Sequence, residues 1–211
     1  MRSAKKSSVC AIVVAGGLST RMGAFKQLLP YGQHTVIEQI VSVLLQCPLD
    51  EVVVVTGHEQ QAIEAKLAAW SVRPVFNSDY QEGEMLSSIR CGLAALDSEC
   101  RAAMLVLADQ PQLEASVVRQ LIKAYQTGSG SLVVPSFQMR RGHPIIIDQT
   151  YWPEILALAS DKSLRDVITL HADKIDYIVV ETDSVLRDID TPEEYQQELD
   201  QLAAKKSSEF K

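Results

Sequence analysis

Several features that would assign a chain to a special class are missing from this sequence. No stretch of its 211 residues approaches the roughly 20 apolar residues that a membrane-spanning helix needs. The polar, basic N-terminus has no apolar signal-peptide core. Acidic residues outnumber basic ones by 27 to 20, giving a formal charge of -7. That excess argues against nucleic acid and anionic membranes as partners, so any phosphate site must be a local basic pocket.

The sequence also lacks the C-x-x-C spacing of a metal or redox centre. Its four cysteines lie in apolar or helical contexts, which predicts reduced core thiols and favours a cytoplasmic location; they are Cys10, Cys47, Cys91 and Cys100. No internal repeat or composition shift marks a second domain. We therefore expect one domain over residues 9–202, between a flexible N-terminal tail over 1–8 and a flexible C-terminal tail over 203–211.

Strand and helix patterns alternate along the chain. Apolar, β-branched runs predict strands at Val9–Val14, Val52–Thr56, Pro74–Phe76, Ala102–Leu107, Leu132–Pro135, Pro144–Ile147 and Ile175–Val180. Helical spacing predicts helices at Val36–Leu45, Gln60–Trp70, Leu86–Leu96, Ala115–Tyr125, Tyr151–Leu158, Leu164–Leu170 and Pro192–Leu202. Continuous apolar runs are typical of strands covered on both faces, which predicts an α/β fold with three α/β/α layers and a Rossmann-like, doubly wound, mostly parallel sheet. Ligands of such sheets bind at the carboxyl ends of the strands.

A glycine-rich loop with two cations follows the first predicted strand. It begins at Ala15 and contains Gly16, Gly17, Arg21, Gly23 and Lys26. Glycines let the backbone approach a ligand closely, so that its N–H groups can point at phosphate oxygens. The spacing fits neither a Walker A loop, which needs Ser or Thr after its Lys, nor the G-x-G-x-x-G dinucleotide fingerprint. An ordinary strand-to-helix turn with exposed cations is the alternative.

The loop reads A-G-G-x-S-x-R-M-G-x-x-K and is followed by Leu28-Leu29-Pro30. This pattern resembles the signature of the nucleotidyltransferases that act on molybdopterin, which include the cytidylyltransferase and the guanylyltransferase of molybdenum cofactor synthesis. The resemblance extends from about Val9 to Tyr195. It implies a fold of the nucleotide-diphospho-sugar transferase type and a nucleotide-binding role for Ala15, Gly16, Gly17, Arg21 and Lys26.

Two acidic motifs are candidates for metal binding. Asp109 follows a buried strand at the expected ligand edge, where a carboxylate can hold Mg²⁺ together with phosphates and water. Its alternative role is a helix N-cap. Asp190 has the same two alternatives, because Asp190-Thr191-Pro192-Glu193 is also a good helix start. The resemblance implies that both aspartates belong to the metal site, with Asp188 as a neighbour.

Three further residues are candidates for ligand contacts. Asn77 and Ser88 lie between a predicted strand and a helix, where a serine more commonly caps the helix. The resembled family holds base and ribose with this segment, which implies nucleotide contacts for both. His143 follows Arg140 and Arg141, which oppose the acidity of the chain and would face a second anionic substrate. A lone histidine here is more often a surface group, whereas the resemblance implies a role on the acceptor side.

Together these features predict a Mg²⁺-dependent nucleotidyltransferase, with Arg21, Lys26 and Asp109 as its catalytic residues. The resemblance implies molybdopterin as the acceptor and pyrophosphate as the leaving group, with a molybdoenzyme as a recipient of the product. It favours CTP through Asp109-Gln110-Pro111, although Gly16 stands where cytidylyltransferases often carry Ala and guanylyltransferases carry Gly. A guanylyltransferase, a sugar-phosphate nucleotidyltransferase and a non-catalytic cofactor carrier stay open as alternatives.

Overall fold

A computed structural model of the chain describes residues 8–17, 22–81, 84–128 and 130–209. Its main sheet has the strand order β10-β7-β9-β6-β1-β4-β5, with β8 paired to β7, and a separate hairpin joins β2 to β3. The strands are β1 (Val9–Val14), β2 (Pro30–Tyr31), β3 (His34–Thr35), β4 (Glu51–Thr56), β5 (Arg73–Phe76), β6 (Ala102–Leu107), β7 (Leu132–Phe137), β8 (Arg140–Arg141), β9 (Ile145–Asp148) and β10 (Ile175–Val179).

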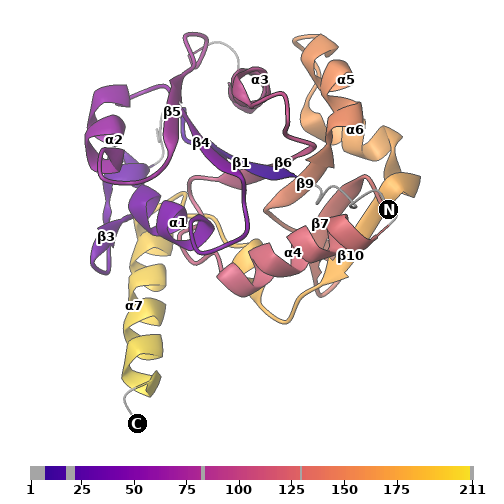
Figure 1. Cartoon of the computed structure of the whole chain (residues 1–211). Coiled ribbons are helices and arrows are strands. Elements are labelled where there is room, and N and C mark those ends of the chain that lie inside the picture. The colour runs from indigo at the N-terminus through magenta and orange to yellow at the C-terminus, as the bar shows by residue number, and fades with distance from the viewer. Residues whose placement is uncertain (1–7, 18–21, 82–83, 129, 210–211) are drawn as a thin grey trace.

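Helices cover both faces of this sheet (Figure 1). They are α1 (Val36–Leu44), α2 (Gln60–Leu67), α3 (Glu84–Ala95), α4 (Ala115–Thr127), α5 (Trp152–Ala157), α6 (Leu164–Leu170) and α7 (Pro192–Glu209). Short 3-10 turns lie at Lys26–Leu28, Gln149–Tyr151, Ala172–Lys174 and Asp183–Val185. The predicted three-layer α/β fold with a mostly parallel sheet is confirmed.

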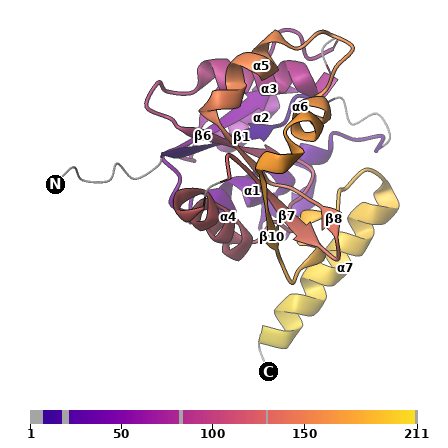
Figure 2. The same ribbon diagram turned by 90° about the vertical axis from the view of Figure 1, so that its right-hand side faces the viewer.

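The core forms one cluster on each face of the sheet. On β1, Val9, Ala11 and Val13 join a cluster with α1, α2 and α4, whereas Ile12 joins a cluster with α3, α5 and α6. Figure 2 shows α3, α5 and α6 above the sheet, and α1 and α4 below it. The continuous apolar run of β1 is therefore explained by burial on both faces, as expected for a central parallel strand.

Three features of the fold differ from the expectation. β9 runs antiparallel to both β6 and β7, and the short strands β2, β3 and β8 were not predicted. The last helix ends at Glu209 rather than at Leu202, so the expected C-terminal tail is helical over 203–209. The expected N-terminal tail lies outside the described residues, apart from Ser8.

All four cysteines are free thiols. Cys10, Cys47 and Cys100 are buried, as predicted for core thiols, and Cys91 is only partly buried. Across the described ranges of the chain, no helix is both long enough and apolar enough to cross a bilayer.

Candidate nucleotide and metal site

The strand order places a topological switch point beside β1. From β1 the chain continues through β4 to β5 on one side, and then returns to β6 on the other side. The loops after β1 and β6 therefore leave the carboxyl edge of the sheet in opposite directions. Open α/β sheets bind ligands at such a switch point. The loop after β1 leads to Lys26, and Asp109 follows β6.

Lys26 joins two aspartates that are distant in the sequence. Its ammonium donates to Asp109 Oδ2 at 2.7 Å and to Asp190 Oδ1 at 3.1 Å. The side chain of Lys26 is only 12% exposed, against 22% for Asp109 and 27% for Asp190. Burial lowers the pKa of Lys26, but the two carboxylates outweigh this effect and raise the pKa above its ordinary value. Lys26 is therefore a charged ammonium across the neutral pH range.

A short local motif orients Lys26. The 3-10 turn Lys26–Leu28 is closed by the Leu28 N–H, which donates to the Phe25 carbonyl at 3.1 Å. Gln27 is buried, with 2% of its surface exposed. Because adjacent residues of a turn point in different directions, burial of Gln27 leaves Lys26 directed toward the two aspartates.

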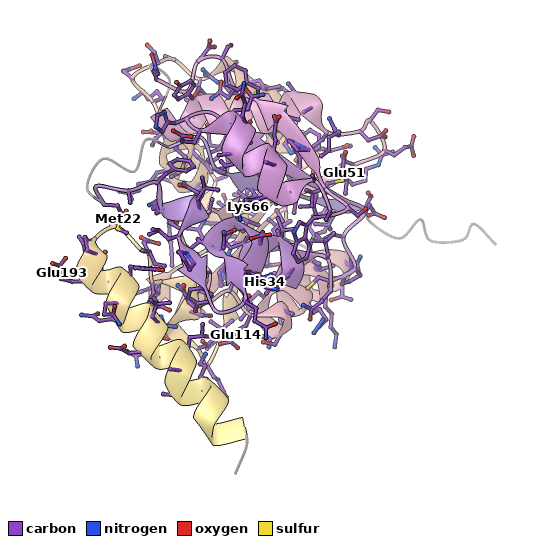
Figure 3. The ribbon with its side chains drawn as sticks, turned by 90° about the vertical axis from the view of Figure 1, so that its left-hand side faces the viewer. Met22, His34, Glu51, Lys66, Glu114 and Glu193 are labelled. Atoms are coloured by element: carbon purple, nitrogen blue, oxygen red, sulfur yellow. The ribbon has the colours of Figure 1, made fainter. Side chains whose placement is uncertain are left out.

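Neither of the two aspartates has the alternative role of a helix cap. Thr191 caps α7, since its hydroxyl accepts from the Glu194 N–H at 3.2 Å and Glu194 Oε2 accepts from the Thr191 N–H at 2.9 Å. The Asp190 carboxylate is thus available to Lys26. Asp109 caps no helix either, because α4 begins only at Ala115. Figure 3 shows Glu193 at the start of α7, the helix that Thr191 caps.

A third carboxylate, that of Asp188, lies next to the pair. Gln110 Nε2 donates to Asp188 Oδ1 at 2.7 Å. Burial raises the pKa of Asp188, and the carboxylates of Asp109 and Asp190 add to the rise, while the Gln110 hydrogen bond and Lys26 oppose it. Among the described residues these three carboxylates face the ammonium of Lys26, so the cluster favours binding of a cation.

The donor atoms of this cluster fit a hard divalent cation. Asp109 Oδ1 is buried and has no hydrogen-bond partner among the described residues. Carboxylate oxygens are the ligands that Mg²⁺ prefers, usually one or two of them completed by phosphate oxygens and water. No group of three or more acidic, His or Cys side chains in the described ranges has the geometry to hold a metal ion alone. Asp109 and Asp190 would therefore share a cation with oxygens of a bound ligand.

The expected nucleotide residues come together on the other side of the loop after β1. A Cβ on Gly16 would lie 3.0 Å from Ser88 Oγ and 3.8 Å from the backbone of Gly57. Asn77 Nδ2 donates to Ser87 Oγ at 2.8 Å and to Ser88 Oγ at 3.1 Å. The loops after β1, β4 and β5 thus meet at the first turns of α3, so only small groups fit beside Gly16.

The individual predictions at this place have different outcomes. Ser88 is not the cap of α3, which begins at Glu84 and places Ser88 inside the helix. Ser88 is 3% exposed and Asn77 is 4% exposed, so both side chains are packed inside the fold next to the loop after β1. Ala15 is fully buried, whereas Gly17 is exposed and no described atom lies within 4 Å of where its Cβ would be. Arg21, predicted to contact the triphosphate, lies outside the described residues.

His143 is partly buried and lies near Asp109. Its backbone N–H donates to the Val185 carbonyl at 2.9 Å, and its ring Nδ1 is buried without a partner among the described residues. Burial lowers the pKa of His143, against the opposing effects of Asp109 and the Leu105 carbonyl. Arg140 and Arg141, expected on the acceptor side, are exposed, and the Arg141 guanidinium lies 5.2 Å from the ring centroid of Tyr177.

Sequence reasoning missed an aromatic row beside the loop. The rings of Phe25 and His58 meet edge to face at 5.6 Å, and those of His58 and Tyr80 lie 6.4 Å apart. Gly57 permits this arrangement, because a Cβ there would lie 2.6 Å from Tyr80 Cβ. Gly57 after a buried strand was the one available signal, since the three aromatic residues come from separate loops.

Comparison with known proteins adds the family context. The family profile of the MobA-like NTP transferase domain matches residues 11–175. The molybdenum cofactor cytidylyltransferase of Escherichia coli (strain K12) is 26% identical over 190 residues, which cover 90% of this chain and 94% of that protein. Nicotine blue oxidoreductase of Paenarthrobacter nicotinovorans is 31% identical over 194 residues, which cover 88% of this chain and 94% of that protein.

A solved structure agrees over the same length. Rv0371c of Mycobacterium tuberculosis H37Rv superposes with a TM-score of 0.82 at 27% identity, covering 92% of this chain and 98% of the other. The same mycobacterial protein has also been solved in complex with manganese.

Proposed function

Since the chain belongs to the family of MobA-like NTP transferase domains, we propose that it is a Mg²⁺-dependent nucleotidyltransferase. It moves a nucleoside monophosphate from a triphosphate to the phosphate of a molybdopterin-type acceptor and releases pyrophosphate. The observation that carries this proposal is the contact of Lys26 with both Asp109 and Asp190 at the switch point of the sheet. One ammonium among three carboxylates supplies both a phosphate contact and the ligands for a cation.

Each part of the site has a defined task in this reaction. The backbone of Gly16 and Gly17 lies along the triphosphate, and Lys26 places a positive charge beside its α- and β-phosphates. Asp109 and Asp190 hold Mg²⁺, which when bound neutralises charge on the phosphate oxygens. Arg21 forms a forked contact with the triphosphate in this proposal. His143, with Arg140 and Arg141, forms the acceptor side.

The acceptor phosphate needs no general base. A phosphomonoester has a second pKa of about 6, so its oxygen is largely ionised at neutral pH. The task of the protein is then to align that oxygen opposite the leaving pyrophosphate and to stabilise charge on the α-phosphoryl group. No nucleophilic side chain is required in this proposal.

CTP is the proposed donor, and two observations support this choice. Asp109-Gln110-Pro111 is of the cytidylyltransferase type, and the Escherichia coli relative is named as a cytidylyltransferase. Gly16 favours GTP instead, because guanylyltransferases carry Gly at this position. We place the reaction in the cytoplasm, with a molybdoenzyme as the recipient of the product.

The relative named as an oxidoreductase means that the family alone does not fix the reaction. The proposal is therefore tested in two steps with the full chain. Thermal shifts with CTP, GTP, ATP and UTP, each with Mg²⁺, identify the base, and pyrophosphate release with molybdopterin then tests transfer. We expect the largest shift with CTP and pyrophosphate release only when molybdopterin is present. Nucleotide binding without pyrophosphate release would replace the transferase by a carrier.

A further inference from the structure

Two buried glutamines follow Asp109 in the loop after β6. Gln110 is 4% exposed and Gln112 is 7% exposed. A buried amide is costly unless it is hydrogen-bonded, so its partners show what the burial achieves. Both amides donate to one segment of the chain, residues 184–188.

Both amides donate hydrogen bonds from Nε2. Gln110 Nε2 donates to Asp188 Oδ1 at 2.7 Å. Gln112 Nε2 donates to the carbonyls of Ser184, at 3.3 Å, and of Arg187. The two side chains therefore bind residues 184–188 through three acceptor atoms, one each on Ser184, Arg187 and Asp188.

The backbone and α7 hold the same segment from other sides. The Ile189 N–H donates to the Asp109 carbonyl at 2.9 Å, directly before Asp190. Arg187 Nε lies 3.2 Å from Glu198 Oε1, and the Glu198 side chain is 6% exposed within the inner face of α7. The segment that carries Asp190 is thus hydrogen-bonded to Asp109, which supplies the other carboxylate of the proposed metal site.

We propose that Gln110 and Gln112 are positioning residues that hold residues 184–190 against the β6 loop, so that Asp190 and Asp109 bind one divalent cation together. This inference rests on the proposed function, because it concerns the metal site of that reaction. Asp190 lies between a 3-10 turn and α7, and its own segment has no strand or α-helix to fix it. The amide contacts supply that rigidity before the cation arrives. The metal site is therefore preorganised by the protein.

The test measures Mn²⁺ binding to the full chain in the presence of CTP by electron paramagnetic resonance, with Mn²⁺ and CTP alone as the blank, because the two aspartates share the cation with ligand oxygens. The variants Gln110→Met and Gln112→Met, singly and together, keep side-chain length and remove the amide donors. Partners that orient metal ligands typically contribute about 10- to 100-fold in metal affinity, and we expect a loss of that size in the double variant. Saturating Mn²⁺ should restore kcat in the single variants, since their defect is in holding the cation.

Tyr125→Phe is the matched control. It removes a partly buried hydrogen bond, from Tyr125 OH to Asp148 Oδ2 at 2.6 Å. Asp148 pairs with Ala102 at the start of β6, so this bond lies at the amino end of that strand, away from the proposed metal site. We expect a thermal midpoint lowered as in the glutamine variants, with Mn²⁺ affinity unchanged. A loss of Mn²⁺ affinity in Tyr125→Phe of the same size would mean that the effect is general destabilisation, and would overturn the inference.

The outcomes separate the two proposals. If the unmodified chain does not bind Mn²⁺ in the presence of CTP, the proposed function fails. If it binds Mn²⁺ and the folded double variant binds it equally well, only the positioning role fails. Should the double variant not fold, the single variants decide, because each removes one part of the contact. If both single variants then bound Mn²⁺ as tightly as the unmodified chain, the positioning role would be refuted.

Discussion

Replacing Lys26 by Met removes the charge at the centre of the site and keeps the apolar stem. In the unmodified protein the ammonium lies 2.7 Å from Asp109 Oδ2 and 3.1 Å from Asp190 Oδ1. Without it, these carboxylates and that of Asp188 lose the positive charge of Lys26 and repel one another more strongly. We therefore expect Lys26→Met to lower both the stability of the metal-free protein and the rate of transfer.

The expected size follows from burial. Removing one partner of a fully buried ion pair costs about 3–5 kcal/mol. The side chains of Lys26, Asp109 and Asp190 are 12%, 22% and 27% exposed, so solvent screens the ion pairs. We therefore expect a smaller cost in folding free energy, of about 2 kcal/mol. For a chain of this length that corresponds to a decrease of roughly 4–8 °C in thermal midpoint. Loss of a charged contact in the transition state costs about 3–4 kcal/mol, or roughly 10²- to 10³-fold in kcat.

Differential scanning fluorimetry with and without Mn²⁺ measures the stability effect. We expect Mn²⁺ to stabilise Lys26→Met at least as strongly as the unmodified protein, since the ion replaces the lost ammonium between the carboxylates. Lys174→Met is the control, because its pair with Asp173 is exposed and exposed pairs contribute little. Equal midpoints and equal kcat in Lys26→Met and the unmodified protein would refute the reasoning.

Three further predictions concern positions around the site. Gly142→Ala should cost about 3 kcal/mol in urea unfolding, because its Cβ would lie 2.3 Å from the Val185 carbonyl oxygen; a cost below about 1 kcal/mol would contradict this packing. Gly16→Ala should cost about 1 kcal/mol and change the CTP-to-GTP ratio of kcat/KM, as its Cβ would lie 3.0 Å from Ser88 Oγ; an unchanged ratio would exclude a role in base choice. Burial raises the pKa of Glu198, so its charged form is disfavoured in the folded state and stability is lost as pH rises through the folded pKa. The thermal midpoint of Glu198→Gln, measured relative to the unmodified protein, should therefore rise between about pH 4 and about pH 7, on top of a pH-independent cost for removing the carboxylate from Arg187; a relative midpoint that falls over this range would reverse this sign.

Most of the fold could be predicted because its strands are buried on both faces. The run of β4, Val52 to Val55, is entirely apolar, and all four residues are buried. Strand direction was not readable in the same way, because apolar content does not distinguish the antiparallel β9 from its parallel neighbours. The end of α7 was missed for a different reason. Its apolar stripe stops at Leu202, whereas the helix continues through residues of good helix propensity as far as Glu209.

The residues of the site also differ in whether the sequence alone predicts them. Lys26 and Asp109 were predicted because each follows a strand at the carboxyl edge, where parallel strands bring distant residues together, whereas Asp190 was assigned through the family resemblance. Their contacts span 83 and 164 residues of sequence. Gln110 and Gln112 carried no such signal, because a buried amide is recognisable only once its partners are known. His143 was predicted for the acceptor side, whereas its packing against Val185 and near Asp109 depends on tertiary contacts.

The most direct test of the proposed reaction follows the label in CTP. The full chain is incubated with molybdopterin, Mg²⁺ and CTP labelled in its α-phosphate, and both products are quantified. We expect labelled CMP on molybdopterin together with one equivalent of pyrophosphate, and we expect Asp109→Asn, with its altered metal ligand, to form neither. Labelled product formed equally well by Asp109→Asn, or no product with any of the four nucleotides, would contradict the proposed reaction.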